Sequence, residues 1–83
     1  MGMEIKVLGP GCKNCKTLEG TVLDVLEKMG LEASVVKVES PKEIVELGVM
    51  MTPGLIINGK IKSTGRVPKP EDISKWIKEE TGK

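Results

Sequence analysis

The chain has 83 residues, of which 39% are hydrophobic and 30% are charged, and its formal net charge is +1. This length fits one domain, residues 1–83, and the composition is typical of a globular chain. The balanced charge and the single aromatic residue, Trp76, argue against nucleic-acid binding. No apolar run approaches the roughly 18 residues that a membrane span needs, and no leader pattern opens the chain. We therefore expect a cytoplasmic protein that binds neither nucleic acid nor a membrane.

The first predicted elements are a strand and a long helix. Apolar residues at 3, 5 and 7 alternate with charged ones, which predicts a strand that ends at the Gly-Pro-Gly run of residues 9–11. From about Cys12 the apolar spacing changes to three and four residues. This spacing predicts a helix up to Met29, with Gly30 after its end. Gly20 lies inside this helix, at a cost of about 1 kcal/mol relative to Ala, which allows for a kink or a close backbone contact there.

The next pair of elements is a strand over residues 31–38 and a short helix. Val36 and Val38 are out of phase with the apolar residues at 31, 33 and 35, so we expect a bulge or burial on both faces. Ser40-Pro41-Lys42-Glu43 has the pattern of a capping box, in which Ser40 caps the helix and Glu43 reaches back. The helix is predicted to end at Gly48.

The last third of the chain predicts a hairpin and a helix. Asn58-Gly59 separates two apolar runs, and both residues tolerate the positive φ of a tight hairpin turn. Lys60 and Lys62 suit an exposed edge strand. After Pro70, apolar residues at 73, 76 and 77 form the stripe of a final helix, in which Trp76 is expected to anchor the core. The order is β-α-β-α-β-β-α, which predicts an α/β fold with a four-stranded mixed sheet and helices on both faces.

The chemistry of the chain centres on Cys12 and Cys15, its only two cysteines. The Cys-Lys-Asn-Cys motif lies where the first strand passes into the first helix. The first turn of a helix carries unpaired N–H groups and a partial positive charge, which stabilise a thiolate and lower its pKa. Lys13 and Lys16 add positive charge. Two intervening residues bring both sulfurs to the same end of the helix, so the motif favours thiol–disulfide exchange.

The two cysteines are also compatible with several other uses. They could be unrelated buried residues or a structural disulfide, although so small a loop constrains little. A zinc site needs four ligands, and this chain has no histidine, so only a dimer could complete one. A Cu(I) or Zn(II) carrier that uses the same pair is an alternative function, but Pro10 stands where carriers of the heavy-metal-associated type have Met, and the chain ends in a helix. A non-catalytic module that senses redox state is a further alternative.

The sequence resembles the thioredoxin-fold superfamily over nearly its whole length. The resemblance rests on Gly11 to Lys16, on Met51-Thr52-Pro53-Gly54, on the Asn58-Gly59 turn, and on Thr64-Gly65 before the last helix. Small archaeal and bacterial thioredoxin/glutaredoxin-like redox proteins, often called redox-active disulfide proteins, are the most similar group. The resemblance implies a dithiol–disulfide oxidoreductase whose redox group is a Cys12–Cys15 disulfide, with no cofactor and no metal. Its partners would be proteins or small molecules that contain disulfides, and an unknown reductase that supplies electrons.

The family's functional positions fall on particular residues of this chain. Cys12 matches the attacking thiol and Cys15 the resolving thiol. Pro53 matches the cis-proline that faces the disulfide, and Thr52 would offer its backbone to a substrate strand. Gly65 would leave room for that strand. Gly11 and Lys13, which flank Cys12, complete the expected substrate-binding set.

The sequence also departs from the family at several positions. Gly11 and the Lys13-Asn14 pair replace the Trp and the Gly-Pro of thioredoxins. Lys6 stands where thioredoxins keep a buried acid that serves the resolving thiol. The segment of residues 63–66 lacks the acids through which glutaredoxins bind glutathione. Met50 and Met51 precede Thr52, and we expect them to pack against the protein, the alternative being a flexible substrate surface.

Overall fold

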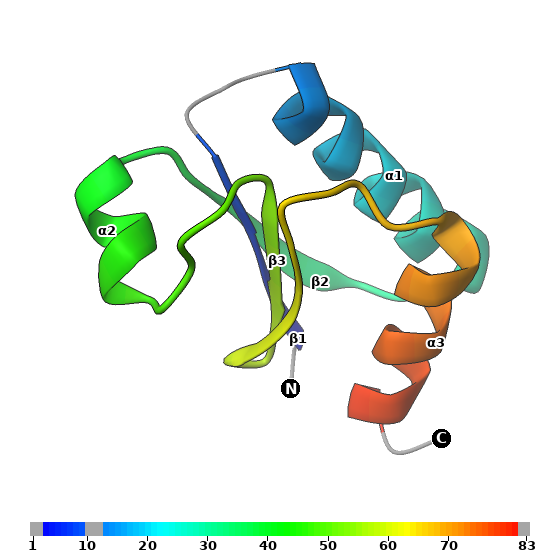
Figure 1. The fold of residues 1–83 in the computed structure, drawn as a ribbon. Helices are drawn as coiled ribbons and strands as arrows, with labels where there is room; N and C mark the ends of the chain where they lie inside the picture. The colour runs from blue at the N-terminus through cyan, green and yellow to red at the C-terminus, as the bar shows by residue number, and fades with distance from the viewer. Residues whose placement is uncertain (1–2, 10–12, 82–83) are drawn as a thin grey trace.

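The computed structural model describes residues 3–9 and 13–81, and its elements follow the predicted order (Figure 1). The elements are β1 (Met3–Leu8), α1 (Lys13–Met29), β2 (Ala33–Val38), α2 (Pro41–Glu46), β3 (Gly54–Ile57), β4 (Lys60–Thr64) and α3 (Pro70–Thr81). Bounds differ from the prediction by a few residues, because β2 starts at Ala33 and β4 continues to Thr64. None of the helices in this described part of the chain is both long and apolar enough to cross a bilayer.

The four strands form one mixed sheet in the order β2-β1-β3-β4. β1 is parallel to β2 and antiparallel to β3, and β3 is antiparallel to β4. The turn between β3 and β4 contains Asn58 at φ 51° and Gly59 at φ 81°, as the Asn-Gly signal predicts. Of the two alternatives expected for β2, the bulge is not found, because β2 pairs with β1 in unbroken register. The register shifts instead between Leu55 and Ile56, where β3 pairs with β4.

Helices cover the two faces of the sheet unequally (Figure 1). α1 and α3 pack on one face, where they enclose the larger hydrophobic cluster with alternate residues of β1 and β3. Its fully buried members include Ile5, Leu18, Leu55, Ile73 and Ile77. Trp76 is half-buried against this cluster.

The short helix α2 covers part of the other face. Ile44 of α2 packs there with Leu8, Val38, Val49 and Ile56. Val38 therefore faces α2 while Ala33 and Val35 pack against the larger cluster, so β2 has packed residues on both of its faces. This face is left more open, since Val36 and Ile61 are 40% and 46% exposed.

Two local expectations about the helices are corrected by the structure. Ser40 is the N-cap residue of α2 and Pro41 begins the helix, but the Ser40 side chain makes no capping hydrogen bond. Both Ser40 and Glu43 are exposed, so water can satisfy the first N–H groups without the reciprocal pair. Gly20 makes no close contact, because a Cβ built there would meet nothing within 4 Å, and α1 runs through it without a break.

Candidate functional site

The residues that the sequence singles out lie along one edge of the sheet, the edge that is formed by the ends of its strands. Because β1 and β2 run parallel while β3 runs the opposite way, the carboxyl ends of β1, β2 and β4 meet the amino end of β3. α1 also begins at this edge (Figure 1). We call the group formed by Gly9, residues 13–16, residues 50–54 and residues 64–66 the site edge. Gly11 and Cys12, two of the predicted site residues, lie outside the described residues.

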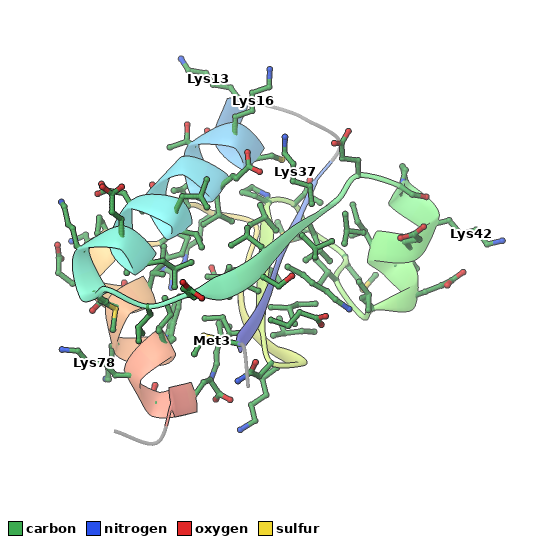
Figure 2. The ribbon with its side chains drawn as sticks, turned by 180° about the vertical axis from the view of Figure 1, so that it is seen from behind. Met3, Lys13, Lys16, Lys37, Lys42 and Lys78 are labelled. Carbon is green, nitrogen blue, oxygen red and sulfur yellow. The ribbon has the colours of Figure 1, made fainter. Side chains whose placement is uncertain are left out.

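Cys15 lies in the first turn of α1 and its side chain is buried, with 5% of the residue exposed. It is disulfide-bonded, and Cys12 is the only other cysteine in the sequence. The first turn of α1 contains no acidic residue. The unpaired N–H groups of this turn and the exposed ammonium groups of Lys13 and Lys16 therefore make the surroundings of Cys15 electropositive. Figure 2 shows both lysines projecting from this end of the helix.

Gly9 holds the end of β1 against Cys15. A Cβ built at Gly9 would overlap Cys15 Sγ, would lie 3.0 Å from Cys15 Cβ and would come within 3.9 Å of Thr52 Cβ. The Gly9 N–H donates to the Val38 carbonyl at 2.9 Å, which fixes the strand end against β2. Only glycine fits this position without displacing the sulfur. The sequence pattern marks Gly9 only as the end of a strand, and the signal for its closer role is a glycine three residues before the first cysteine.

The segment that leads into β3 lies on the same side of the sheet. The Thr52–Pro53 peptide bond is cis, and Pro53 is fully buried while Thr52 is exposed. The contact geometry at Gly9 places Thr52 next to Cys15. Within residues 3–9 and 13–81, no backbone hydrogen bond involves Thr52. With respect to this described part of the chain, its N–H and C=O can therefore pair with an extended ligand.

Gly65 connects the end of β4 to this segment. Its N–H donates to the Pro53 carbonyl at 2.9 Å, and its φ is 75°, a conformation that residues with a side chain rarely adopt. A Cβ built at Gly65 would lie 3.2 Å from Met51 Cε and 3.3 Å from Met51 Cβ. Gly65 is therefore in contact with the Met51 side chain, which lies over it. The structure thus brings Cys15, Thr52, Pro53 and Gly65 to one edge.

The two methionines before Thr52 are more exposed than predicted. Met50 is 91% exposed and Met51 is 63% exposed. The expectation that both pack against the protein is wrong for Met50, because no described element covers its side chain. The result is a flexible apolar surface beside Thr52.

Lys6 occupies the position at which thioredoxins keep a buried acid. Its side chain is 29% exposed and lies 3.6 Å from a carboxylate oxygen of Glu4, measured from Nζ. Lys6 also lines an open cavity with Val36, Val38 and residues of α2. It lies on β1 three residues before Gly9, on the face that α2 covers in part.

Comparison with known proteins agrees with this arrangement. A family model described as the thioredoxin domain matches residues 3–78. The chain belongs to the thioredoxin domain family. It is 36% identical over 75 residues to a thioredoxin of Methanothermobacter thermautotrophicus, which covers 90% of this chain and 97% of that one. It is 34% identical over 74 residues to a thioredoxin of Methanocaldococcus jannaschii, which covers 89% and 85% of the two chains.

Solved structures show the same fold at lower identity. Thioredoxin-2 of the malaria parasite, described as a component of its protein secretion machinery, superposes with a TM-score of 0.71 at 14% identity, covering 94% of this chain and 82% of that one. A second malarial protein superposes with a TM-score of 0.70 at 14% identity, covering 95% and 97%. At this identity the likeness concerns the fold alone. The family membership supports a redox function of the thioredoxin type in general terms.

Proposed function

We propose that this protein is a dithiol–disulfide oxidoreductase that acts through Cys12 and Cys15. The observation that supports this most directly is the disulfide-bonded Cys15, buried in the first turn of α1 beside Thr52 and its cis bond to Pro53. Cys12 precedes α1 in the sequence and Cys15 lies inside it. This order supports Cys12 as the attacking sulfur and Cys15 as the resolving one.

The reaction proceeds by two exchanges. The Cys12 thiolate attacks one sulfur of a substrate disulfide, a mixed disulfide forms, and the other substrate sulfur leaves as a thiolate that takes up a proton. The Cys15 thiol loses its proton and attacks Cys12 Sγ, which releases the second substrate thiol and forms the Cys12–Cys15 disulfide. Two electrons have then passed to the substrate. A reductase must return two electrons to the cysteine pair before the next cycle.

The other site residues have supporting roles in this proposal. Thr52 pairs its free backbone groups with an extended substrate segment next to Cys15, as a strand added to the edge of the site. Gly65 leaves that segment space, and Gly11 and Lys13, the sequence neighbours of Cys12, complete the proposed substrate-binding set. The lysines and the helix N-terminus stabilise the thiolate form. The disulfide itself is the redox group, so the proposal includes no cofactor or metal, and it places the protein in the cytoplasm, where a reductase can keep the pair reduced.

The test uses the full chain, reduced and then freed of reductant, with a disulfide-bonded peptide as substrate. We expect the wild-type protein to reduce the peptide, and Cys15→Ser to accumulate one covalent adduct per chain by mass spectrometry. Cys12→Ser is the matched control and should form none. Wild-type protein that reduces no disulfide, or Cys15→Ser that traps no adduct, would contradict the proposal.

The same samples separate the alternatives that use these cysteines. A metal carrier would bind Cu(I) or Zn(II) tightly in its reduced form and would reduce the peptide little. A redox-sensing module would exchange slowly with dithiothreitol and would bind a partner in one oxidation state only. A metal titration run beside the reduction assay therefore distinguishes all three functions.

A further inference from the structure

The net charge is small, but basic and acidic residues are concentrated in different segments of the chain. Residues 5–18 and 47–70 contain seven lysines and arginines and no aspartate or glutamate, so these two segments carry +7. All twelve acidic residues and the other six lysines lie elsewhere, so the rest of the chain carries −6. The two basic segments are the ones that supply the site edge: β1 with the start of α1, and the loop of residues 47–53 with β3, β4 and the turn after it.

Three of these seven cations are paired with acidic groups in the tertiary structure. Lys60 and Lys62 lie at the opposite edge of the sheet, where Glu80 pairs with both, and Lys6 pairs with Glu4 on β1. Lys69 is exposed directly before α3, four residues beyond Gly65, and the other three cations belong to the segments that form the site edge. We call these three exposed residues, Lys13 and Lys16 of α1 and Arg66 next to Gly65, the basic rim.

The nearest acidic groups do not cancel the basic rim. Glu19, on the next turn of α1, pairs with Lys37 of β2 at 3.4 Å. Glu39 follows β2, which lies on the side of β1 away from β3 and β4, and Glu43 of α2 lines the cavity beside Lys6 on the face that α2 covers. Lys42 lies among these two acids, on α2, and projects from the molecule on that side (Figure 2). Towards Thr52 and Gly65 the basic rim is therefore unopposed within the described residues.

We infer that the basic rim selects disulfides whose flanking residues are acidic, so that the preferred protein substrates carry Asp or Glu next to the cysteine that is attacked. This inference rests on the proposed oxidoreductase function. An extended segment paired with the Thr52 backbone would pass between α1 and the turn at Gly65, with cations on both sides of it. Exposed charges of this kind raise association rates more than equilibrium affinity, and salt screens them. The exposed methionines, by contrast, add apolar contact without distinguishing charge.

The experiment compares three peptide disulfides that differ only in the residues beside the cysteines, which are Asp and Glu, Ser, or Lys. The second-order rate constant for reduction by the full-length reduced protein is measured for each at 20 mM and 500 mM NaCl. We expect the acidic peptide to react about tenfold faster than the neutral one at low salt, within the range of electrostatic steering. The ratio should fall to about twofold or less at high salt, because the screening length drops well below about 10 Å.

Two variants test whether the preference for acidic peptides comes from the basic rim. Arg66→Glu should lower the acidic-to-neutral ratio at least threefold, in keeping with steering by nearby charges. Lys75→Glu changes an exposed cation on α3 by the same amount and should leave the ratio within error. Arg66 is used because it lies outside the Cys-x-x-Cys motif. The acidic-to-neutral ratio within one variant cancels any change in the reactivity of the protein thiol. Comparison of this ratio between variants cancels any difference in the intrinsic reactivity of the peptides.

The outcomes separate this inference from the proposed function. Equal rates for the three peptides at both salt concentrations would overturn the inference and leave the oxidoreductase function intact. An equal loss of the ratio in Lys75→Glu would also overturn it, because the effect would then come from the charge of the whole protein. Reduction of none of the peptides would overturn both.

Discussion

The two edges of the sheet, which lie at opposite ends of its strands, are held together by different kinds of contact. The site edge depends on close contacts: Gly9 lies against Cys15 and Gly65 lies under Met51, while no backbone hydrogen bond between described residues involves Thr52. The opposite edge depends on polar contacts between elements. There the Glu4 N–H donates to Asn58 Oδ1 at 3.0 Å, the Asn58 N–H donates to the Glu4 carbonyl at 2.7 Å, and Glu80 contacts two lysines. Substitutions at the first edge should therefore impair chemistry and stability together, whereas those at the second should change stability alone.

The largest effect is expected at Gly9. A methyl group in Gly9→Ala overlaps the Cys15 sulfur, so the strand end or the first turn of α1 must move. Overpacking of this kind costs about 1–3 kcal/mol of unfolding free energy, which urea denaturation of the oxidised protein measures. The displacement of Cys15 should also slow peptide disulfide reduction by about tenfold or more, since small misplacements of reacting groups are costly.

The same substitution at Gly20 is the control for Gly9→Ala. A methyl group there enters open space on an exposed part of α1, so Gly20→Ala should raise the unfolding free energy by up to about 1 kcal/mol. Its reduction rate should match that of the wild type. If Gly9→Ala showed wild-type stability and rate, the close packing of β1 on Cys15 would not matter for function.

A smaller effect is expected at Gly65. Gly65→Ala forces a residue with a side chain to adopt φ 75° and brings its methyl group against Met51. The left-handed conformation costs about 1–2 kcal/mol. Thermal or urea denaturation measures the loss, and the Michaelis constant for a peptide disulfide should rise as the space beside Thr52 narrows. An unchanged Michaelis constant would remove Gly65 from the substrate-binding set.

The smallest effect is expected at Glu80, on the opposite edge. The hydrogen bond from Lys62 lowers the pKa of the Glu80 carboxyl below its ordinary value of 4.5, and Lys60 acts in the same direction. A lowered folded-state pKa contributes stability that is present above about pH 4.5 and is lost as the pH falls through the lowered value. Glu80→Gln should therefore destabilise the protein modestly at pH 7 and much less in acid.

Urea midpoints measured between pH 7 and pH 3 test this dependence, with the reduction rate at pH 7 as the second measurement. The rate should stay at the wild-type value, because Glu80 lies far from the site edge. A constant stability difference over this pH range would contradict the role of the two ion pairs. A loss of reduction rate would contradict the separation of the two edges.

Much of the fold could be predicted from local patterns. The order of all seven elements, the hairpin at Asn58-Gly59 and the edge position of its second strand, β4, follow from apolar spacing and turn chemistry. For β2 the phase change at Val36 and Val38 has two explanations in the sequence, a bulge or burial on both faces. Only the packing of α2 against Val38 shows that burial on both faces is the correct one.

The candidate site was predicted in part. The spacing of the cysteines and the Thr52-Pro53 pair indicated where the chemistry would lie. The closeness of Gly9 to Cys15 was missed because a glycine at a strand end has many uses. The exposure of Met50 was missed because hydrophobicity alone does not say whether a residue near a strand will be covered.

The sequence by itself determined the chemical groups and the elements that carry them, because helix and strand periods, capping and turn residues act over a few neighbouring positions. Only the tertiary structure decided which residues meet. The antiparallel return of β3 beside β1 brings residues 52–53 to Cys15, and the end of β4 brings residues 65–66 to the same place. Contacts between residues some 40 positions apart depend on strand order and direction, which no local pattern encodes.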